Sequence, residues 1–148
     1  MKICGIVAEY NPFHLGHAYH IARTRERLGP DTAIVCCMSA SWVQRGEAAL
    51  MPKHLRARAA LLSGADLILE LPAAGALRSA EGFAHSAVSR LMGLGVLTDL
   101  SFGAESEDIG DLLYIAQTLL EHRTVQETLT QLKIGISYAA ARERALYA

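Results

Sequence analysis

Two histidines, His14 and His17, are the side chains of this sequence whose type and spacing best suit chemistry. Their imidazole N–H groups can donate hydrogen bonds to phosphate oxygens, and charge-assisted bonds of this kind are worth about 1.5–3 kcal/mol each. Gly16 lies between them and, because it has no Cβ, lets an anion or a nucleobase lie against the backbone. Phosphoryl and nucleotidyl transfer depend mainly on positioning and on neutralising oxygen charge, so these residues predict a nucleotide-phosphate site.

A metal site and a purely structural role are the alternatives for these histidines. His14, His17 and His20 could bind zinc, but side chains at this spacing fan out around a helix, and no Cys or carboxylate offers an obvious fourth ligand. The sequence therefore favours phosphate, and we predict no metal ligand. The remaining histidines are expected on helix surfaces or in packing contacts: His54, His85 and His122.

A strand, a turn and a helix must position the motif. The apolar run Lys2–Ala8 predicts a strand buried on both faces, and Asn11-Pro12 predicts the turn that follows it. A helix is expected over about Leu15–Leu28, which places the histidines at its N-terminus. Unpaired backbone N–H groups and the helix dipole attract phosphate at such a position.

The rest of the chain continues this alternation of strands and helices. Further strands are expected at Thr32–Met38, Asp66–Leu71 and Val96–Phe102. The order predicts an α/β fold, a doubly wound parallel sheet of about four or five strands with helices on both faces. Five other helices are expected. The first has Pro52 in its first turn, and the second is capped by Ser79 and ends near Leu94. The third begins with Ser106-Glu107-Asp108, and the last two are expected over Thr124–Leu132 and Ser137–Tyr147. Their expected buried faces include Leu55, Ala59 and Leu62 after Pro52, and Ile109, Leu112, Leu113, Ala116 and Leu120 after Asp108.

In such sheets, ligands bind beyond the carboxyl ends of the strands. Arg45, in the loop Val43–Glu47, could hold a phosphate or carboxylate bidentately or belong to a solvated turn. Gly103 could let an adenine lie over it or form a plain tight turn, and Glu70 could serve the site or a loop hydrogen bond. The residues expected at this edge are Glu9, Tyr10, Asn11, Ser39, Ser41, Glu70, Gly103 and Glu105.

Length and composition predict one globular domain, since the chain has 148 residues of which 51% are apolar. No apolar run reaches the ~18 residues of a membrane span, and the first one is too short for a signal peptide, so we expect a cytoplasmic protein without membrane association. The sequence predicts no particular oligomeric state. The cysteines are expected to be packing residues: Cys4, Cys36 and Cys37.

The net charge of -1 argues against a globally basic nucleic-acid binder and leaves local basic patches open. The basic residues of two helices could face RNA or could simply be solvated helix faces. They are Arg23, Arg25, Lys53, Arg56 and Arg58.

Five sequence blocks, in chain order, resemble one enzyme family. His14-Leu15-Gly16-His17 resembles the signature of the nucleotidylyltransferase superfamily, which has a Rossmann-like fold. Together the blocks are similar to the bacterial tRNA(Met) cytidine acetate ligases. The blocks are Glu9-Tyr10-Asn11-Pro12-Phe13-His14, Val43-Gln44-Arg45-Gly46-Glu47, Ala65-Asp66-Leu67-Ile68-Leu69-Glu70-Leu71-Pro72, Phe102-Gly103-Ala104-Glu105 and Ser137-Tyr138-Ala139-Ala140-Ala141-Arg142.

The resemblance implies a two-step reaction in which residues 1–148 form the ATP-binding domain. Acetate attacks the α-phosphate of ATP, giving acetyl-adenylate and pyrophosphate. The acetyl group then passes to N4 of the wobble cytidine of elongator tRNA(Met). ATP and Mg²⁺ are the implied cofactors, and acetate and this tRNA are the implied partners.

The resemblance also implies which residues form the site. His14 and His17 would be catalytic, and Arg45 would hold the substrate anion. Ser39, at the end of its strand, is also expected to contact the substrate. The ATP-binding residues would be Val7, Ala8, Glu9, Tyr10, Asn11, Pro12, Phe13, His14, Leu15, Gly16, His17, His20 and Gly103. The sequence departs from the family pattern where Leu15 replaces an asparagine and where Ala40-Ser41 replaces a Gly-Asn pair.

The C-terminal, tRNA-binding part of that family has no counterpart in this sequence, so we expect either a fragment of a longer protein or a short relative. Two other functions stay open. The chain could be a coenzyme adenylyltransferase that acts on a phosphorylated acceptor, or a nucleotide-binding module without turnover.

Overall fold

The structure is a computed structural model that describes residues 1–105 and 108–147. These residues form two compact units, Met1–Gly103 and Ala104–Ala148, and each is described by itself. The single domain expected from the chain length stays a prediction. The elements are, in chain order, β1 (Ile3–Ala8), α1 (Leu15–Leu28), β2 (Ala33–Ser39), α2 (Lys53–Leu62), β3 (Leu67–Leu71), α3 (Ala73–Ala76), α4 (Ala80–Met92), β4 (Asp99–Ser101), α5 (Ile109–Leu120), α6 (His122–Lys133) and α7 (Tyr138–Leu146).

The first unit is built on a parallel sheet with the strand order β3-β2-β1-β4. β1 pairs along its whole length with β2, from Ile3 opposite Ala33 to Ala8 opposite Met38, and pairs with β4 on its other side. The predicted parallel α/β sheet is therefore confirmed. The strand order reverses between β1 and β4, and α/β sheets open a ligand crevice at such a reversal.

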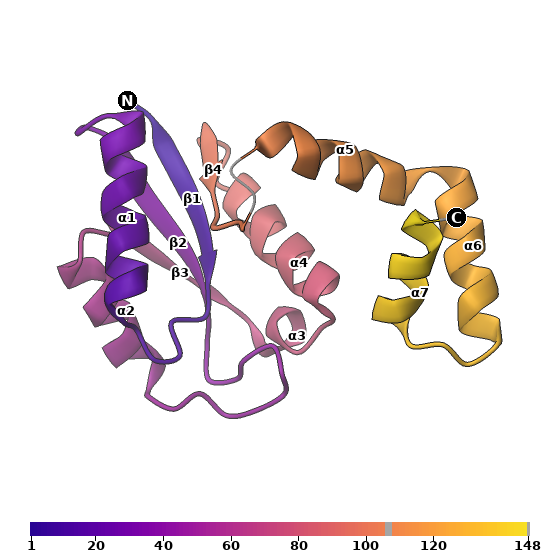
Figure 1. Cartoon of the computed structure of the whole chain (residues 1–148). Coiled ribbons are helices and arrows are strands. Elements are labelled where there is room, and N and C mark those ends of the chain that lie inside the picture. The colour runs from indigo at the N-terminus through magenta and orange to yellow at the C-terminus, as the bar shows by residue number, and fades with distance from the viewer. Residues whose placement is uncertain (106–107, 148) are drawn as a thin grey trace. The chain divides into compact units, whose positions relative to one another are not determined.

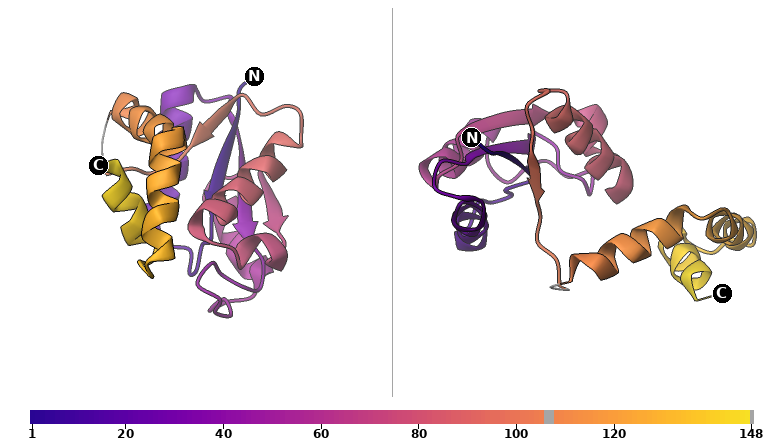
Figure 2. Two further views of the ribbon diagram at one scale, coloured as in Figure 1. Left: turned by 90° about the vertical axis from the view of Figure 1, so that its right-hand side faces the viewer. Right: turned by 90° about the horizontal axis from the view of Figure 1, so that it is seen from above.

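Helices cover both faces of this sheet (Figures 1 and 2). On one face, Ile21 of α1 and Ala60 of α2 join the buried residues of β1 and β2. On the other face, Ala76 of α3 and Leu91 of α4 pack against β2 and β3. Each strand of the centre is thus buried on both sides, which explains its unbroken apolar sequence.

The cysteines are packing residues, as predicted. Cys36 and Cys37 follow each other on β2 and therefore join the buried clusters on opposite faces of the sheet. Like Cys4, they are free and fully buried. Burial raises the pKa of all three thiols to about 11.

α2 buries a different face from the predicted one. Leu55 and Leu62 are exposed and Ala59 is half-buried, whereas Arg56 and Ala60 are buried. Apolar residues occur on several sides of this helix, so their spacing did not identify the buried face. Because Arg56 is buried, it is neither an RNA-facing residue nor part of a solvated helix face.

The elements near the sheet edge also differ from prediction in detail. β4 is shorter than the expected strand Val96–Phe102 because it is an edge strand that pairs only with the middle of β1. The short helix α3 was not predicted, since it is a single turn directly after Pro72. The Ser79 cap of α4 is confirmed: its side chain accepts from the Gly82 N–H at 3.2 Å.

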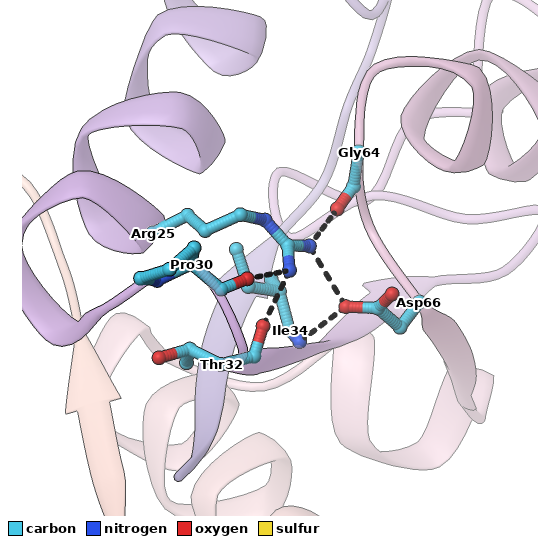
Figure 3. A network of polar contacts seen from close by, with 6 residues as sticks. All are labelled: Arg25, Pro30, Thr32, Ile34, Gly64 and Asp66. Atoms are coloured by element: carbon cyan, nitrogen blue, oxygen red, sulfur yellow. Dashed lines mark hydrogen bonds and ion pairs between the residues drawn. The ribbon is translucent and has the colours of Figure 1, made fainter. Parts of the chain in front are cut away.

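Arg25 ties together the loops at the amino ends of β2 and β3 (Figure 3). Its guanidinium donates to the carbonyls of Thr32 (2.5 Å) and Gly64 (2.6 Å) and pairs with the Asp66 carboxylate (2.9 Å). Asp66 also accepts from the Ile34 N–H (2.7 Å). Arg25 is therefore a structural residue, and its side chain, which is 30% exposed, is not simply part of a solvated helix face.

The second unit consists of α5, α6 and α7, and Figure 2 shows α6 beside α7. α5 begins at Ile109, where Asp108 accepts from the Gly110 N–H at 2.7 Å. Ser106 and Glu107, expected to open this helix, lie outside the described residues. The expected apolar face of α5 contains no buried residue. Over residues 1–105 and 108–147, no helix is long and apolar enough to cross a membrane.

Candidate active site

A cavity of about 440 Å³ lies at the carboxyl end of β1, beside the point where the strand order reverses. Most of its lining comes from the predicted ATP-binding segment, to which Ile6 and Phe83 are added. The structure thus gathers most of the predicted residues of β1, the turn and α1 around one cavity. The lining residues are Ile6, Val7, Ala8, Glu9, Tyr10, Asn11, Pro12, His14, His17, His20 and Phe83.

Tyr10 holds the turn between β1 and α1. Its φ of 50° lies in the left-handed region, which non-glycine residues seldom adopt, and such a conformation costs about 1–3 kcal/mol. The side chain is buried, and its hydroxyl donates to Cys36 Sγ at 3.2 Å. The ring meets Phe13 and His17 edge-on, with centroids 5.0 and 4.8 Å apart. These contacts offset the strain and restrict the orientation of the His17 ring.

His14 and His17 cap the start of α1 reciprocally. The Gly16 N–H donates to Nδ1 of His14 (3.1 Å), and the His14 N–H donates to Nδ1 of His17 (3.2 Å). A ring nitrogen that accepts carries no proton, so both neutral imidazoles have their N–H at Nε2. The two rings are stacked, with centroids 3.7 Å apart. The motif therefore offers a ligand two Nε2–H donors on adjacent rings.

This cap changes the role expected for the helix N-terminus. The N–H groups of His14 and Gly16, expected to be free for phosphate, are bound by imidazoles. The space beside Gly16, expected to admit an anion, holds the His14 ring: a Cβ at Gly16 would lie 3.0 Å from Cε1 and 3.1 Å from Nδ1. Two backbone N–H groups of the motif are thus occupied, and its side-chain donors are the Nε2–H groups of the two imidazoles.

Two histidines of the cavity have lowered pKa values. Burial lowers the pKa of His17 below its ordinary value, and the neighbouring His14 and His20 lower it further. Burial also lowers the pKa of His20. His17 and His20 are therefore neutral at about pH 7, and an anion bound beside His17 would favour its protonated form.

His20 is held by a chain of hydrogen bonds between α1 and β4. The Thr24 hydroxyl donates to the His20 carbonyl (2.8 Å) and so accepts from the Ser101 hydroxyl (2.8 Å). Ser101 Oγ in turn accepts from His20 Nε2 (2.8 Å). With these donors and acceptors, His20 carries its proton at Nε2, and this N–H binds Ser101 rather than a ligand.

Two residues of the cavity wall hold the loop that joins β2 to α2. The Glu9 carboxylate accepts from the Gln44 N–H (2.6 Å), and the Asn11 side-chain oxygen accepts from the Leu50 N–H (2.7 Å). The loop is thereby attached to the wall at two points.

The other predicted site residues lie outside the cavity lining. Arg45 is exposed in the turn of the β2–α2 loop, and Gly103 is exposed after β4. Ser39 is fully buried, and its Oγ is the buried side-chain polar atom for which the described residues offer no hydrogen-bond partner. Glu70 pairs with Lys53 at 2.5 Å, so its observed contact is an ion pair at the end of β3.

Three further members of the predicted ATP segment do not line the cavity. Phe13 packs against the core on the α1 side of the sheet. Leu15 is 88% exposed. Gly16 leaves room for the His14 ring, because it has no Cβ. The roles assigned to these residues, and to those of the lining, stay predictions.

Sequence reasoning missed Phe83, Thr24 and Ser101. Phe83 lies in the first turn of α4, and helices of a parallel α/β sheet begin at the edge where the strands end. The Ser79 cap was therefore a signal that could have placed Phe83 beside the cavity. The pair Thr24 and Ser101 is separated by 77 residues, and no spacing pattern links them.

The chain is similar to a known family and to curated proteins of one kind. Residues 1–148 match the family model described as HIGH Nucleotidyl Transferase. Among curated relatives, the tRNA(Met) cytidine acetate ligase of Acetivibrio thermocellus is 45% identical over 148 residues, and that of Clostridium kluyveri is 47% identical over 151 residues. These matches cover 99% of this chain and 35% and 36% of the relatives. The chain thus spans about a third of the length of the curated relatives it matches.

Two solved structures are similar to almost the whole chain. Thermotoga maritima TmcAL bound with alpha-thio ATP has a TM-score of 0.88 and 43% identity, covering 99% of this chain and 36% of that one. The apo form of Thermotoga maritima TmcAL has a TM-score of 0.90 and 44% identity, with 99% and 35% covered.

Proposed function

Because the chain belongs to the HIGH nucleotidyl transferase family, we propose that it binds ATP in the cavity at the end of β1 and activates acetate as acetyl-adenylate. The observation that carries this proposal is the pair of stacked histidines, His14 and His17, each with its Nε2–H available in the lining of that cavity. The similarity to a TmcAL structure bound with alpha-thio ATP supports the choice of nucleotide. The relatives named tRNA(Met) cytidine acetate ligase support the choice of acetate.

In the proposed reaction, a carboxylate oxygen of acetate forms a bond to the α-phosphorus of ATP. The bond from that phosphorus to the bridging oxygen of the β-phosphate breaks, and pyrophosphate leaves with the electron pair. His14 and His17 donate their Nε2–H groups to phosphate oxygens and stabilise the charge that develops in the transition state. Magnesium bound to the phosphates of ATP would neutralise further charge.

Ser39 and Arg45 are the proposed contacts to the acceptor. The buried Ser39 Oγ has a free donor and acceptor at the end of β2, next to the strand that ends in the cavity. Arg45 can pair with a carboxylate bidentately, and its loop is attached to the cavity wall through Glu9 and Asn11.

The proposed second step transfers the acetyl group to tRNA. The N4 amine of the wobble cytidine of elongator tRNA(Met) attacks the acetyl carbonyl, AMP leaves, and the amine loses a proton. This step belongs to a longer protein in our proposal, because the similar ligases are covered to only 35% and 36% by this chain. Its proposed place is the cytoplasm, where tRNA and ATP are both present.

The exchange of labelled pyrophosphate into ATP tests the first step. Reversible activation of acetate predicts exchange that requires both acetate and magnesium. Exchange without any carboxylate, or only with a phosphorylated acceptor, would contradict the proposal and favour a coenzyme adenylyltransferase. ATP binding in calorimetry without exchange for any acceptor would indicate a nucleotide-binding module.

A further inference from the structure

Arg56 has an unusual environment for an arginine. It lies in α2, is 1% exposed, and is the largest of the fully buried side chains among the described residues. None of the ion pairs formed by the described residues includes it. Burying a charge without an ionic partner is unfavourable unless hydrogen bonds replace its hydration.

Three backbone carbonyls replace that hydration. Nη1 of Arg56 donates to the Glu9 carbonyl (2.6 Å), Nε donates to the Met51 carbonyl (3.0 Å), and Nη2 donates to the Ala40 carbonyl. The donors of a guanidinium lie in one plane at fixed angles. All three bonds can therefore form only while the three carbonyls keep their relative positions.

These carbonyls belong to the segments that surround the cavity. Glu9 lines the cavity at the end of β1, Ala40 directly follows β2, and Met51 lies just before Pro52, the N-cap residue of α2. Arg56 thus bonds to both ends of the β2–α2 loop and to the wall on which the loop rests. Burial lowers the pKa of Arg56, and the nearby Glu9 carboxylate partly offsets this effect.

We propose that Arg56 is a positioning residue for the cavity: it holds the Glu9 main chain in the wall and fixes the β2–α2 loop that carries Arg45. The bonds from Gln44 to Glu9 and from Leu50 to Asn11 complete the attachment of the loop. The link to ATP rests on the proposed function, whereas the attachment of the loop does not.

Arg25 provides a matched control. It also donates to three backbone carbonyls, those of Pro30, Thr32 and Gly64, but at the amino ends of the strands. A general structural role would make replacement of either arginine equivalent. A positioning role would affect the loop and the ligand only when Arg56 is replaced.

The experiment compares Arg56→Met with Arg25→Met in the 148-residue chain. Hydrogen exchange is measured at the amides of Gln44 and Leu50, and ATP binding is measured by calorimetry. Arg56→Met should accelerate exchange at both amides about tenfold or more and weaken ATP binding about tenfold. Arg25→Met should leave both exchange rates and the ATP affinity at wild-type values, although its Tm falls.

Arg56→Lys is the second variant, because lysine keeps the charge but lacks the planar fork of donors. It should accelerate exchange at the same amides, by less than Arg56→Met. Three results would overturn the proposal. The first is unchanged amide exchange in a folded Arg56 variant, and the second is the same acceleration of exchange in Arg25→Met. The third is loss of folding in both Arg56 variants. A wild-type chain that does not bind ATP would overturn the proposed function instead, and the exchange rates would still decide the role of Arg56.

Discussion

His14 and His17 use one ring nitrogen to cap α1 and leave the other for a ligand. The cap fixes each neutral ring in the Nε2–H form, because Nδ1 accepts a backbone N–H. A histidine pair in this arrangement needs no further residue to set its tautomer. The position of the His14 ring in turn depends on the missing Cβ of Gly16.

Replacing Gly16 by Ala should weaken ATP binding without weakening the fold. The new Cβ would lie 3.0 Å from the His14 ring, which must shift and carry its Nε2–H with it. Alanine is favoured over glycine in a helix by about 1 kcal/mol, which offsets the roughly 1 kcal/mol lost when the His14 cap is disturbed, so stability should change little. We expect the ATP affinity measured by calorimetry to fall about tenfold while the Tm stays about equal.

Gly110→Ala is the matched control for this variant. Gly110 donates to the cap residue of α5 as Gly16 does in α1, and its Cβ would lie 3.0 Å from Asp108 Oδ1. The control should change ATP affinity by less than about twofold, because α5 contributes no residue to the cavity lining. Wild-type ATP affinity in Gly16→Ala would contradict the role proposed for His14.

ATP should raise the pKa of His17. Burial, His14 and His20 lower this pKa in the free protein. The imidazolium form gives up the bond from the His14 N–H to Nδ1 whether or not ATP is bound, so a triphosphate beside the ring still shifts the equilibrium toward that form. Since the protonated ring binds ATP more tightly, the affinity should rise as the pH falls through the pKa of His17 in the complex. NMR titration of the ring with and without ATP measures both values. Adenosine, which lacks phosphate, should leave the pKa lowered, and a pKa that ATP does not raise would place the phosphates elsewhere.

At the scale of elements, periodicity predicted the order and type of most strands and helices. The apolar run of β1 and the N-terminus of α1 at Leu15 were both visible in the sequence. The buried face of α2 was not, because Arg56 is buried by bonds to carbonyls of distant segments. The link from Thr24 to Ser101 likewise depends on β4 pairing with β1, which single-chain spacing does not encode.

The Arg25–Asp66 tie joins the loops that precede two strands, and it makes stability depend on pH. Burial raises the pKa of Asp66, but the bonds from the Ile34 N–H and from Arg25 outweigh this effect and hold the pKa below its ordinary value. A carboxyl group with a lowered folded-state pKa stabilises the fold above its unfolded-state pKa. This contribution disappears as the pH falls through the folded-state pKa.

Asp66→Asn should therefore lower the free energy of unfolding at neutral pH and have little effect in acid. The Asp66 side chain is 49% exposed, so solvent limits the loss to about 1 kcal/mol at about pH 7. Urea unfolding of wild type and variant at about pH 7 and about pH 2 measures the difference. The same difference at both pH values would show that the charge of Asp66 does not stabilise this tie.

At the scale of the whole molecule, the cavity belongs to one of the two compact units. Every lining residue, both buried clusters and the β4 residue that holds His20 lie within Met1–Gly103. The sequence predicted one domain because its length suits one, and no linker composition marks a boundary near Ala104. A division of this kind is set by which residues contact each other in space.

Residues 1–105 alone should fold and bind ATP. They contain the complete sheet, the helices on both of its faces and all of the cavity lining. We expect cooperative urea unfolding and an ATP affinity within about threefold of the value for 148 residues. Residues 1–95 are the matched control, because they lack β4 and with it the Ser101 partner of His20, and should bind ATP at least about tenfold more weakly. A folded 1–105 chain with equally weak binding would show that the second unit contributes to the nucleotide site.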